Sequence, residues 1–156
     1  DVCGGAGDAN TFNSTEGVLY FEVAGFENAN ENRYISLSDG TSANSLRIFY
    51  YSNGATTFFR KYVNSVQTSI VTTSSINQSE SNKIAIRYNS TNFDIFSNGI
   101  KISTNLDSNA FPNNALNVLN FTDTNGVSSP FLGNVKQVIT FNTALSDADL
   151  AALTTI

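Results

Sequence analysis

Residues 83–102 read KIAIRYNSTNFDIFSNGIKI, and the pattern of this stretch predicts the class of fold. In KIAIRY, the two isoleucines and the tyrosine occupy alternate positions, as they do when one face of a β-strand is buried. Asn98 and Gly99 then separate FDIFS from IKIST, and an Asn-Gly pair readily adopts the positive φ angles of a two-residue type I′ turn. The stretch therefore predicts antiparallel strands that are joined by a tight hairpin.

Comparable strand and turn signals continue in both directions along the chain. Short apolar runs rich in β-branched and aromatic residues recur about every ten residues, a spacing typical of a sandwich or barrel. Asp39-Gly40 and Asn53-Gly54 separate further runs and are expected to form the same type of hairpin turn. The predicted strands lie within Gly17–Phe26, Arg33–Ser38, Ser45–Tyr51, Thr56–Val63, Ser65–Thr73, Lys83–Tyr88, Phe93–Ser97, Ile100–Thr104, Leu116–Phe121 and Phe131–Phe141.

One helix is expected after the last strand, within residues 143–154. Ser146 is a suitable N-cap, and two aspartates follow it in the first turn, where they complement the helix dipole. Leu145, Leu150 and Leu153 can attach this helix to the sheets. The chain is thus predicted to be all-β with a single short C-terminal helix.

The segment FLGNVKQVITFNTALSDADLAAL, from Phe131 to Leu153, resembles the closing strand and helix of LamG-like domains. In that family a glycine, an alternating apolar strand and an aromatic residue precede a helix of the form A-L-S-x-x-E/D-L. The residues at these places are Gly133, Val135, Val138, Phe141, Ala144, Leu145, Ser146 and Leu150. The hairpin at 83–102 and the segment YISLSDGTSANSLRIFY at 34–50 are similar to earlier strands of the family.

By this resemblance, residues 16–156 are identified as a LamG-like member of the concanavalin-A-like lectin and glucanase jelly rolls, after a polar, Gly-rich leader at 1–15. The resemblance implies a two-sheet antiparallel β-sandwich with binding loops at one rim or a concave sheet. Many members bind glycans or proteins, often with calcium. The Asn- and Ser-rich texture resembles copies on bacterial surface proteins and phage fibres, so we expect an extracellular or virion-surface location.

Composition excludes several classes of partner. A length of 156 residues suits one domain, and charged residues make up only 13%, about half the usual share. The net charge is −5 with eight dispersed basic residues, which predicts no nucleic-acid binding. No window approaches the ~18 apolar residues of a membrane span.

Methionine is absent, even from position 1, so we expect a piece of a longer protein. Cys3 is the single cysteine and has no partner for a disulfide within the domain.

Catalytic residues are also lacking. The chain contains no histidine, which removes Ser-His-Asp and Cys-His systems and the usual zinc sites. Glycoside hydrolysis needs two carboxylates at a set separation, but Glu22 and Asp94 each stand alone on their predicted strands. The Glu-x-Asp-x-x-Glu strand of the related glucanases has no counterpart here. The sequence therefore predicts a protein that is not an enzyme.

Calcium remains an open alternative for the loops. Asp39, Asp107, Asp123 and Asn125 offer the hard oxygen ligands that calcium prefers. Asp and Asn are equally common in ordinary turns, so no set of metal ligands is assigned.

The turn at Asn53-Gly54 predicts how aromatic and basic residues gather. If it joins two strands as a two-residue turn, Phe49 lies opposite Phe58 and Arg47 lies opposite Arg60. The residues predicted on this shared face are Arg47, Phe49, Tyr51, Phe58, Arg60 and Tyr62. Lys61 would then fall on the core side, so a slipped register or a bulge is expected near it.

Rings beside guanidinium groups suit a sugar, because rings stack on the apolar face of a pyranose and arginine binds hydroxyls or carboxylates. An acidic glycan would fit best. The candidate ligand-binding residues are Arg47, Phe49, Tyr51, Arg60 and Tyr62, with Arg87 as a neighbouring candidate. The alternative is that the rings are structural and that arginine stems shield them.

We therefore expect a non-catalytic carbohydrate-binding or adhesion module of a larger surface or phage fibre protein, with a cell-surface glycan or polysaccharide as partner. The alternative is a structural or protein-interaction module that decorates a virion or forms a homo-oligomer within a fibre.

Overall fold

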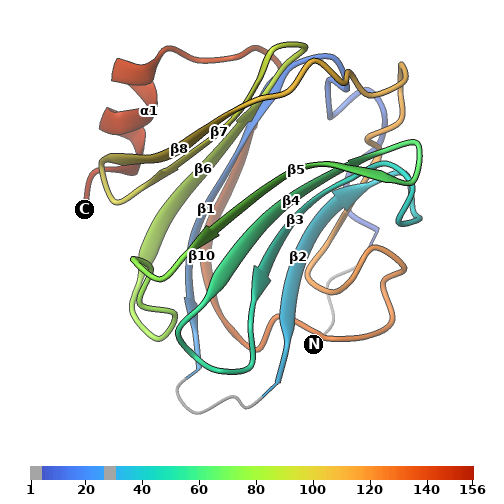
Figure 1. The fold of residues 1–156 in the computed structure, drawn as a ribbon. Coiled ribbons are helices and arrows are strands. Elements are labelled where there is room, and N and C mark those ends of the chain that lie inside the picture. The colour runs from blue at the N-terminus through green and yellow to red at the C-terminus, as the bar shows by residue number, and fades with distance from the viewer. Residues whose placement is uncertain (1–4, 27–30) are drawn as a thin grey trace.

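The computed structural model describes residues 5–26 and 31–156, which form antiparallel strands and a short helix (Figure 1). The elements are β1 (Gly17–Gly25), β2 (Arg33–Ser38), β3 (Ser45–Tyr50), β4 (Thr57–Val63), β5 (Val66–Thr73), β6 (Asn82–Tyr88), β7 (Asn92–Ser97), β8 (Ile100–Leu106), β9 (Val118–Asn120), β10 (Gly133–Phe141) and α1 (Asp147–Thr154). In the described residues, the strands form two five-stranded sheets. We call β10-β1-β6-β7-β8 the helix sheet and β5-β4-β3-β2-β9 the aromatic sheet.

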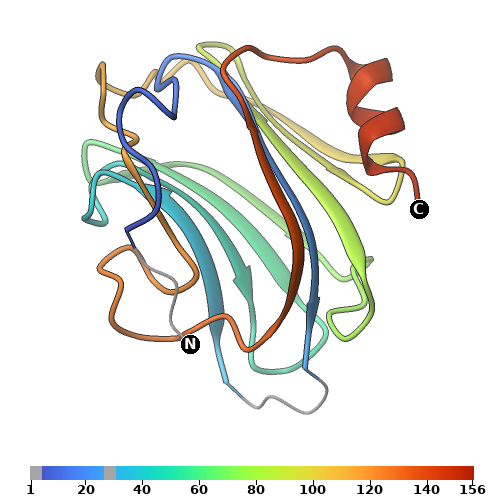
Figure 2. The same cartoon turned by 180° about the vertical axis from the view of Figure 1, so that it is seen from behind.

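The two sheets pack face to face around a main core, and α1 covers the outer side of the helix sheet (Figures 1 and 2). The predicted antiparallel jelly-roll sandwich with a short C-terminal helix is confirmed. No helix in the described part of the chain is both long and apolar enough to cross a membrane.

Strand β1, with the sequence GVLYFEVAG, is almost continuously apolar because it packs on both of its faces. Leu19 and Phe21 point into the main core, whereas Val18 and Tyr20 on the opposite face pack with Leu150 of α1. Because both faces of this strand are covered, period-two alternation of apolar and polar residues is lost. Figure 2 shows β1 between β10 and β6, to which it is hydrogen-bonded.

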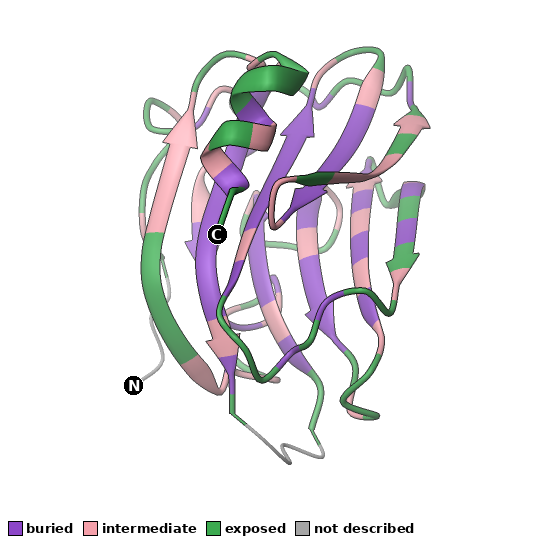
Figure 3. Ribbon diagram, turned by 90° about the vertical axis from the view of Figure 1, so that its left-hand side faces the viewer, coloured by how far each residue is buried: buried purple, intermediate pink, exposed green. Residues whose placement is uncertain are grey.

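Strand β4 alternates cleanly between buried and half-buried residues (Figure 3). Phe59 and Lys61 face the core, whereas Phe58, Arg60 and Tyr62 face outward. The pairing of β4 with β5 shifts register between Lys61 and Tyr62, as the sequence predicted. Lys61 nevertheless remains on the core side and is only 1% exposed.

The hairpin turns follow the sequence signals only in part. Asn98 and Gly99 have φ angles of 51° and 81°, as the predicted type I′ turn requires. At Asn53-Gly54 the prediction of a two-residue turn is wrong, because only Gly54 has a positive φ and the loop spans four residues between Tyr51 and Thr56. The strand register is unchanged, because a four-residue loop centred on the same pair preserves the pairing. Asp39-Gly40 likewise lies in a longer loop, closed by a hydrogen bond from Asp39 to Asn44.

The leader joins the fold over part of its length. Phe12 is buried in the main core, and Ala6 forms a β-bridge with Leu119. Cys3 lies outside the described residues.

The helix begins as predicted. The Oγ atom of Ser146 accepts a hydrogen bond from the backbone N–H of Asp149 at 3.2 Å, which identifies Ser146 as the N-cap. Leu150 is fully buried against the helix sheet, and Leu145 and Leu153 pack around it.

Candidate functional site

The outward face of the aromatic sheet carries the predicted cluster of rings and arginines. In the pairing of β3 with β4, Phe49 lies opposite Phe58 and Arg47 lies opposite Arg60. The predicted cross-strand register is therefore confirmed, and we call this surface the aromatic face. Its residues are Tyr34, Arg47, Phe49, Tyr51, Phe58, Arg60 and Tyr62.

Three rings stack in a row across neighbouring strands. Tyr34 on β2 stacks on Phe49 with 4.4 Å between ring centroids, and Phe49 stacks on Phe58 at 5.4 Å. Tyr51 stands edge-on to the two phenylalanines, at 5.7 and 6.1 Å. Phe49 is 5% exposed, whereas Tyr51 is 41% exposed. Phe49 is therefore a buried ring that packs between its neighbours, and Tyr51 is the ring most available to a ligand.

Sequence reasoning missed Tyr34. The residue lies directly opposite Phe49 in the pairing of β2 with β3. The alternation along YISLS could have indicated its position. Ile35 and Leu37 enter the core, so Tyr34 must face outward. The register of the Asp39-Gly40 hairpin places it beside Phe49, but the two-residue turn that the sequence predicted there is shorter than the actual loop and would have given another register.

The two arginines of the aromatic face differ in what they contact. The guanidinium of Arg47 lies 4.3 Å from the Tyr62 ring centroid, and it donates to Ser45 Oγ at 2.9 Å and to the Ser42 carbonyl at 3.1 Å. Arg60 lies over the Phe49 and Phe58 rings, at 5.2 and 4.9 Å. Among the described residues, the side chain of Arg60 forms no hydrogen bond or ion pair, and its Nε atom is buried without a partner.

The face is cationic. Within the described chain, neither Arg47 nor Arg60 forms a salt bridge with a carboxylate. Burial lowers the pKa of Arg47, but a guanidinium keeps its proton in proteins. Burial raises the pKa of Tyr34, while the positive charges of Arg60 and Arg47 lower it in part. Asp123, the acid whose charge reaches this face, has its carboxylate held within its own loop by Ser128 and Val127.

Arg87, the neighbouring candidate predicted from the sequence, does not lie on this face. It lies on β6 of the helix sheet, where Asp94 is its direct cross-strand partner. Its Nε and Nη2 atoms donate to Asp94 Oδ2 at 2.8 and 2.5 Å, and Nη2 lies 2.7 Å from Asp147 at the start of α1. Arg87 also donates to the Leu145 carbonyl at 2.8 Å, so it anchors the helix. Burial lowers the pKa of Arg87, but hydrogen bonds to Asp94 and Asp147 outweigh burial and raise it.

The acids proposed for calcium are engaged in protein contacts. Asp107 forms a buried ion pair with Lys61, and Asp39 accepts hydrogen bonds from Thr41 and Asn44. In the described residues, no three His, Cys, Asp or Glu side chains gather at one place. The structure therefore assigns no ligand set to the calcium alternative.

The model of the concanavalin A-like lectin/glucanases superfamily matches residues 11–151. Among curated proteins, none matches the chain significantly.

Solved structures share the fold at low identity. The carbohydrate-binding module (CBM40) of the Ruminococcus gnavus IT-sialidase, bound to α2,3-sialyllactose, is 18% identical with a TM-score of 0.76, covering 98% of this chain and 94% of that one. A leech intramolecular trans-sialidase is 18% identical with a TM-score of 0.70, over 92% of this chain and 24% of that one. Domain 4 of a Geobacillus stearothermophilus arabinanase, in complex with arabinotriose, is 10% identical with a TM-score of 0.71, over 96% and 70%.

Proposed function

This chain belongs to the concanavalin A-like lectin/glucanases superfamily, and we propose that it is a non-catalytic carbohydrate-binding module for an acidic glycan. One observation carries the proposal. Arg60 lies over a stacked row of aromatic rings and has no acidic partner in the described structure. A cation held on an aromatic surface without its own counter-charge is suited to an anionic ligand that also has an apolar face.

A sugar carboxylate matches this arrangement. A guanidinium can bind a carboxylate through two parallel hydrogen bonds, which gives both charge and geometric selectivity. The exposed ring of Tyr51 can stack against the apolar face of the same sugar ring. Sialyllactose carries such a carboxylate, and it is the ligand named for the R. gnavus module that shares the fold. Sialylated glycans are therefore the first ligands to test.

The absence of catalysis rests on the chemistry of the side chains. The chain has no histidine, and its strand carboxylates are bound to cations. Glu22 lies 2.6 Å from Lys136, and Asp94 lies 2.5 Å from Arg87. Carboxylates committed to ion pairs are poor candidates for the acid and nucleophile of a glycosidase. We place the module on a larger extracellular protein, at a cell surface or on a phage fibre, where a composition low in charged residues and rich in Asn and Ser is typical.

A structural or oligomerising role is the second candidate. Apolar side chains are exposed along the free edges of both sheets, with Val66 and Ile70 on β5 and Ile100 and Leu106 on β8. Unpaired edge strands with apolar side chains can pair with another chain. Sedimentation at high concentration tests this role, because a stable oligomer supports it and a monomer contradicts it.

Calorimetry with 3′-sialyllactose and lactose tests the binding function. We expect selective binding of the sialylated sugar, and a loss of about tenfold or more in Arg60→Gln and Tyr51→Ala. Lys136→Gln is the matched control, because it removes one positive charge from the helix sheet. Unchanged unfolding midpoints would show that the variants are folded. A glycan array with and without calcium extends the test, and a blank array of acidic glycans, or wild-type binding by Arg60→Gln, would contradict the proposal.

A further inference from the structure

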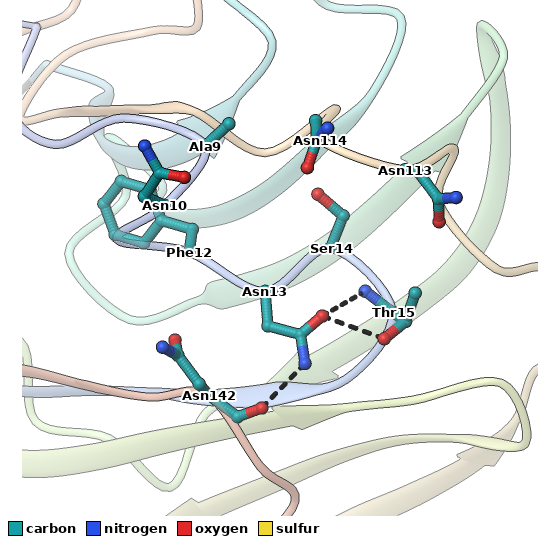
Figure 4. Close-up of a pocket in the computed structure, with 9 residues that line it drawn as sticks. All are labelled: Ala9, Asn10, Phe12, Asn13, Ser14, Thr15, Asn113, Asn114 and Asn142. Atoms are coloured by element: carbon teal, nitrogen blue, oxygen red, sulfur yellow. Dashed lines mark hydrogen bonds between the residues drawn. The ribbon is translucent and has the colours of Figure 1, made fainter.

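A pocket lies where the leader before β1, the loop between β8 and β9, and the residue after β10 come together (Figure 4). Its volume is about 430 Å³, within the range of small-ligand sites. The residues that line it are Ala9, Asn10, Phe12, Asn13, Ser14, Thr15, Asn113, Asn114 and Asn142. We call it the amide pocket, and it shares no residue with the aromatic face.

The wall of the amide pocket is held in place by hydrogen bonds between segments that are distant in sequence. The Nδ2 atom of Asn13 donates to the carbonyl of Asn142 at 2.8 Å, and its Oδ1 atom accepts from Thr15. Ser14 Oγ accepts from the Leu116 N–H at 2.9 Å. Figure 4 shows Asn13 linking the leader to Asn142 on one side of the pocket. The pocket is therefore a formed feature of the fold.

Four of its amides are not used by the protein. In the described structure, the side chains of Asn10, Asn113, Asn114 and Asn142 form no hydrogen bond. Some loop asparagines elsewhere differ: Asn77 and Asn89 accept hydrogen bonds from the Ser or Thr two residues later. The amides of the pocket thus keep both their donors and their acceptors available.

A turn presents two of these amides. The Ala115 N–H donates to the Pro112 carbonyl at 3.2 Å, so Asn113 and Asn114 are the central residues of the turn. Asn114 has a φ of 58°, a left-handed conformation that asparagine tolerates better than most residues. Figure 4 shows Asn113 and Asn114 on the side of the pocket opposite Asn142.

The lining selects for an uncharged, hydroxyl-rich ligand. A primary amide offers a carbonyl acceptor and two N–H donors, and a sugar hydroxyl both donates and accepts. No charged side chain lines the pocket, so an ionic ligand would lose hydration without gaining a counter-charge. We propose that the amide pocket binds an uncharged sugar residue, as a second site independent of the acidic-glycan site.

Nuclear magnetic resonance on the full chain tests this site directly, because side-chain NH₂ groups of asparagine give their own signals. Lactose, maltotriose and arabinotriose serve as neutral probes. We expect at least one of them to cause saturable shifts of the Asn113, Asn114 and Asn142 signals. The double variant Asn114→Gly/Asn142→Ala should weaken that sugar about tenfold, since two hydrogen-bonding groups are lost and glycine accepts the left-handed φ.

Asn125→Ala is the matched control, because it removes an exposed loop amide from outside the pocket. Shifts by none of the three sugars, shifts confined to the aromatic face, or full affinity in the double variant would each overturn the inference. A titration with 3′-sialyllactose in the same spectra reports on Tyr51 and Arg60, so failure of one site is distinguishable from failure of the other.

Discussion

The Nζ atom of Lys61 lies 3.0 Å from the Oδ2 atom of Asp107, and neither side chain reaches solvent. Lys61 also donates to the Asn109 carbonyl at 2.5 Å, and Thr68 and Ser69 donate to the Asp107 carboxylate. This pair joins β4, the strand next to the edge of the aromatic sheet, to the loop that follows β8 of the helix sheet. It therefore fastens the two sheets together at one edge.

Removing one member of this pair should destabilise the domain strongly. Lys61→Met leaves a buried carboxylate without its counter-charge, which costs about 3–5 kcal/mol in comparable sites. The double variant Lys61→Met/Asp107→Leu should recover much of that loss, because both charges are gone. Urea unfolding measures the difference. The control is Lys136→Met, which breaks an ion pair whose lysine is 75% exposed and should change stability little. Equal losses in Lys61→Met and Lys136→Met would contradict the prediction.

The same carboxylate predicts sensitivity to acid. Burial raises the pKa of Asp107, but hydrogen bonds from Asn109, Lys61 and Ser69 outweigh burial and lower it to about 2. Because the folded pKa lies below the unfolded value of 3.8, the unfolded chain binds more protons in this range. The contribution of Asp107 is present above about pH 4 and is lost as the pH falls toward 2. Urea unfolding at several pH values should show a smaller acid-dependent loss in Asp107→Asn than in the wild type, and equal slopes would contradict this assignment.

A glycine at the start of β10 should resist substitution for a steric reason. A Cβ atom added at Gly133 would overlap the carbonyl oxygen of Ala24 and lie 2.9 Å from the Gly25 Cα atom on the adjacent strand. Since both neighbours are backbone atoms, they cannot move aside as a side chain can. Gly133→Ala should therefore lower the free energy of unfolding by about 1–3 kcal/mol in thermal or urea unfolding. Gly40→Ala is a useful contrast. A Cβ atom at Gly40 would meet no other atom, so any loss of stability would come from the φ of 83° alone.

The sequence predicted the parts of the fold that depend on local patterns. Alternation and turn residues located the strands, and the position of Asn53-Gly54 gave the correct register of Phe49 with Phe58 even though the turn is longer than expected. Local patterns do not say which sheet a strand joins. Arg87 was misplaced for that reason, since its neighbours are set by the pairing of β6 with β1 and β7.

The amide pocket shows a different limit. Asn13, Asn114 and Asn142 carry no special spacing in the sequence, and they meet only because three segments come together once both sheets have formed. An asparagine in a loop is ordinary turn chemistry until its neighbours are known. A site of this kind is accessible only from the folded structure.

The helix should stabilise the domain without contributing to binding at the aromatic face. Leu150 is fully buried between α1 and the outer side of the helix sheet. Leu150→Ala should cost about 2–5 kcal/mol in unfolding experiments, as for other buried leucines. Its affinity for 3′-sialyllactose should stay at the wild-type value, because the aromatic face lies on the other sheet. A variant that is folded but has lost binding would show that the helix side takes part in recognition.

The two arginines of the aromatic face should make unequal contributions to binding. Arg47 is held by Ser45, Ser42 and the Tyr62 ring, so its guanidinium has few donors left for a ligand. The guanidinium of Arg60 is held by contacts with rings alone among the described residues, which leaves its terminal Nη donors available. We expect Arg60→Gln to lose at least about tenfold more affinity for 3′-sialyllactose than Arg47→Gln, as measured by calorimetry.

The salt dependence of the affinity for 3′-sialyllactose distinguishes the loss of a contact between charges from the loss of shape complementarity. Wild-type affinity for the sialylated sugar should fall as ionic strength rises, because the contact is between opposite charges near the surface. Arg60→Gln should bind weakly and with a flatter salt dependence, whereas Arg47→Gln should keep most of the wild-type slope. If Arg47→Gln instead removed the salt dependence and Arg60→Gln retained it, the ligand carboxylate would lie beside Tyr62, and the assignment of Arg60 as its partner would be wrong.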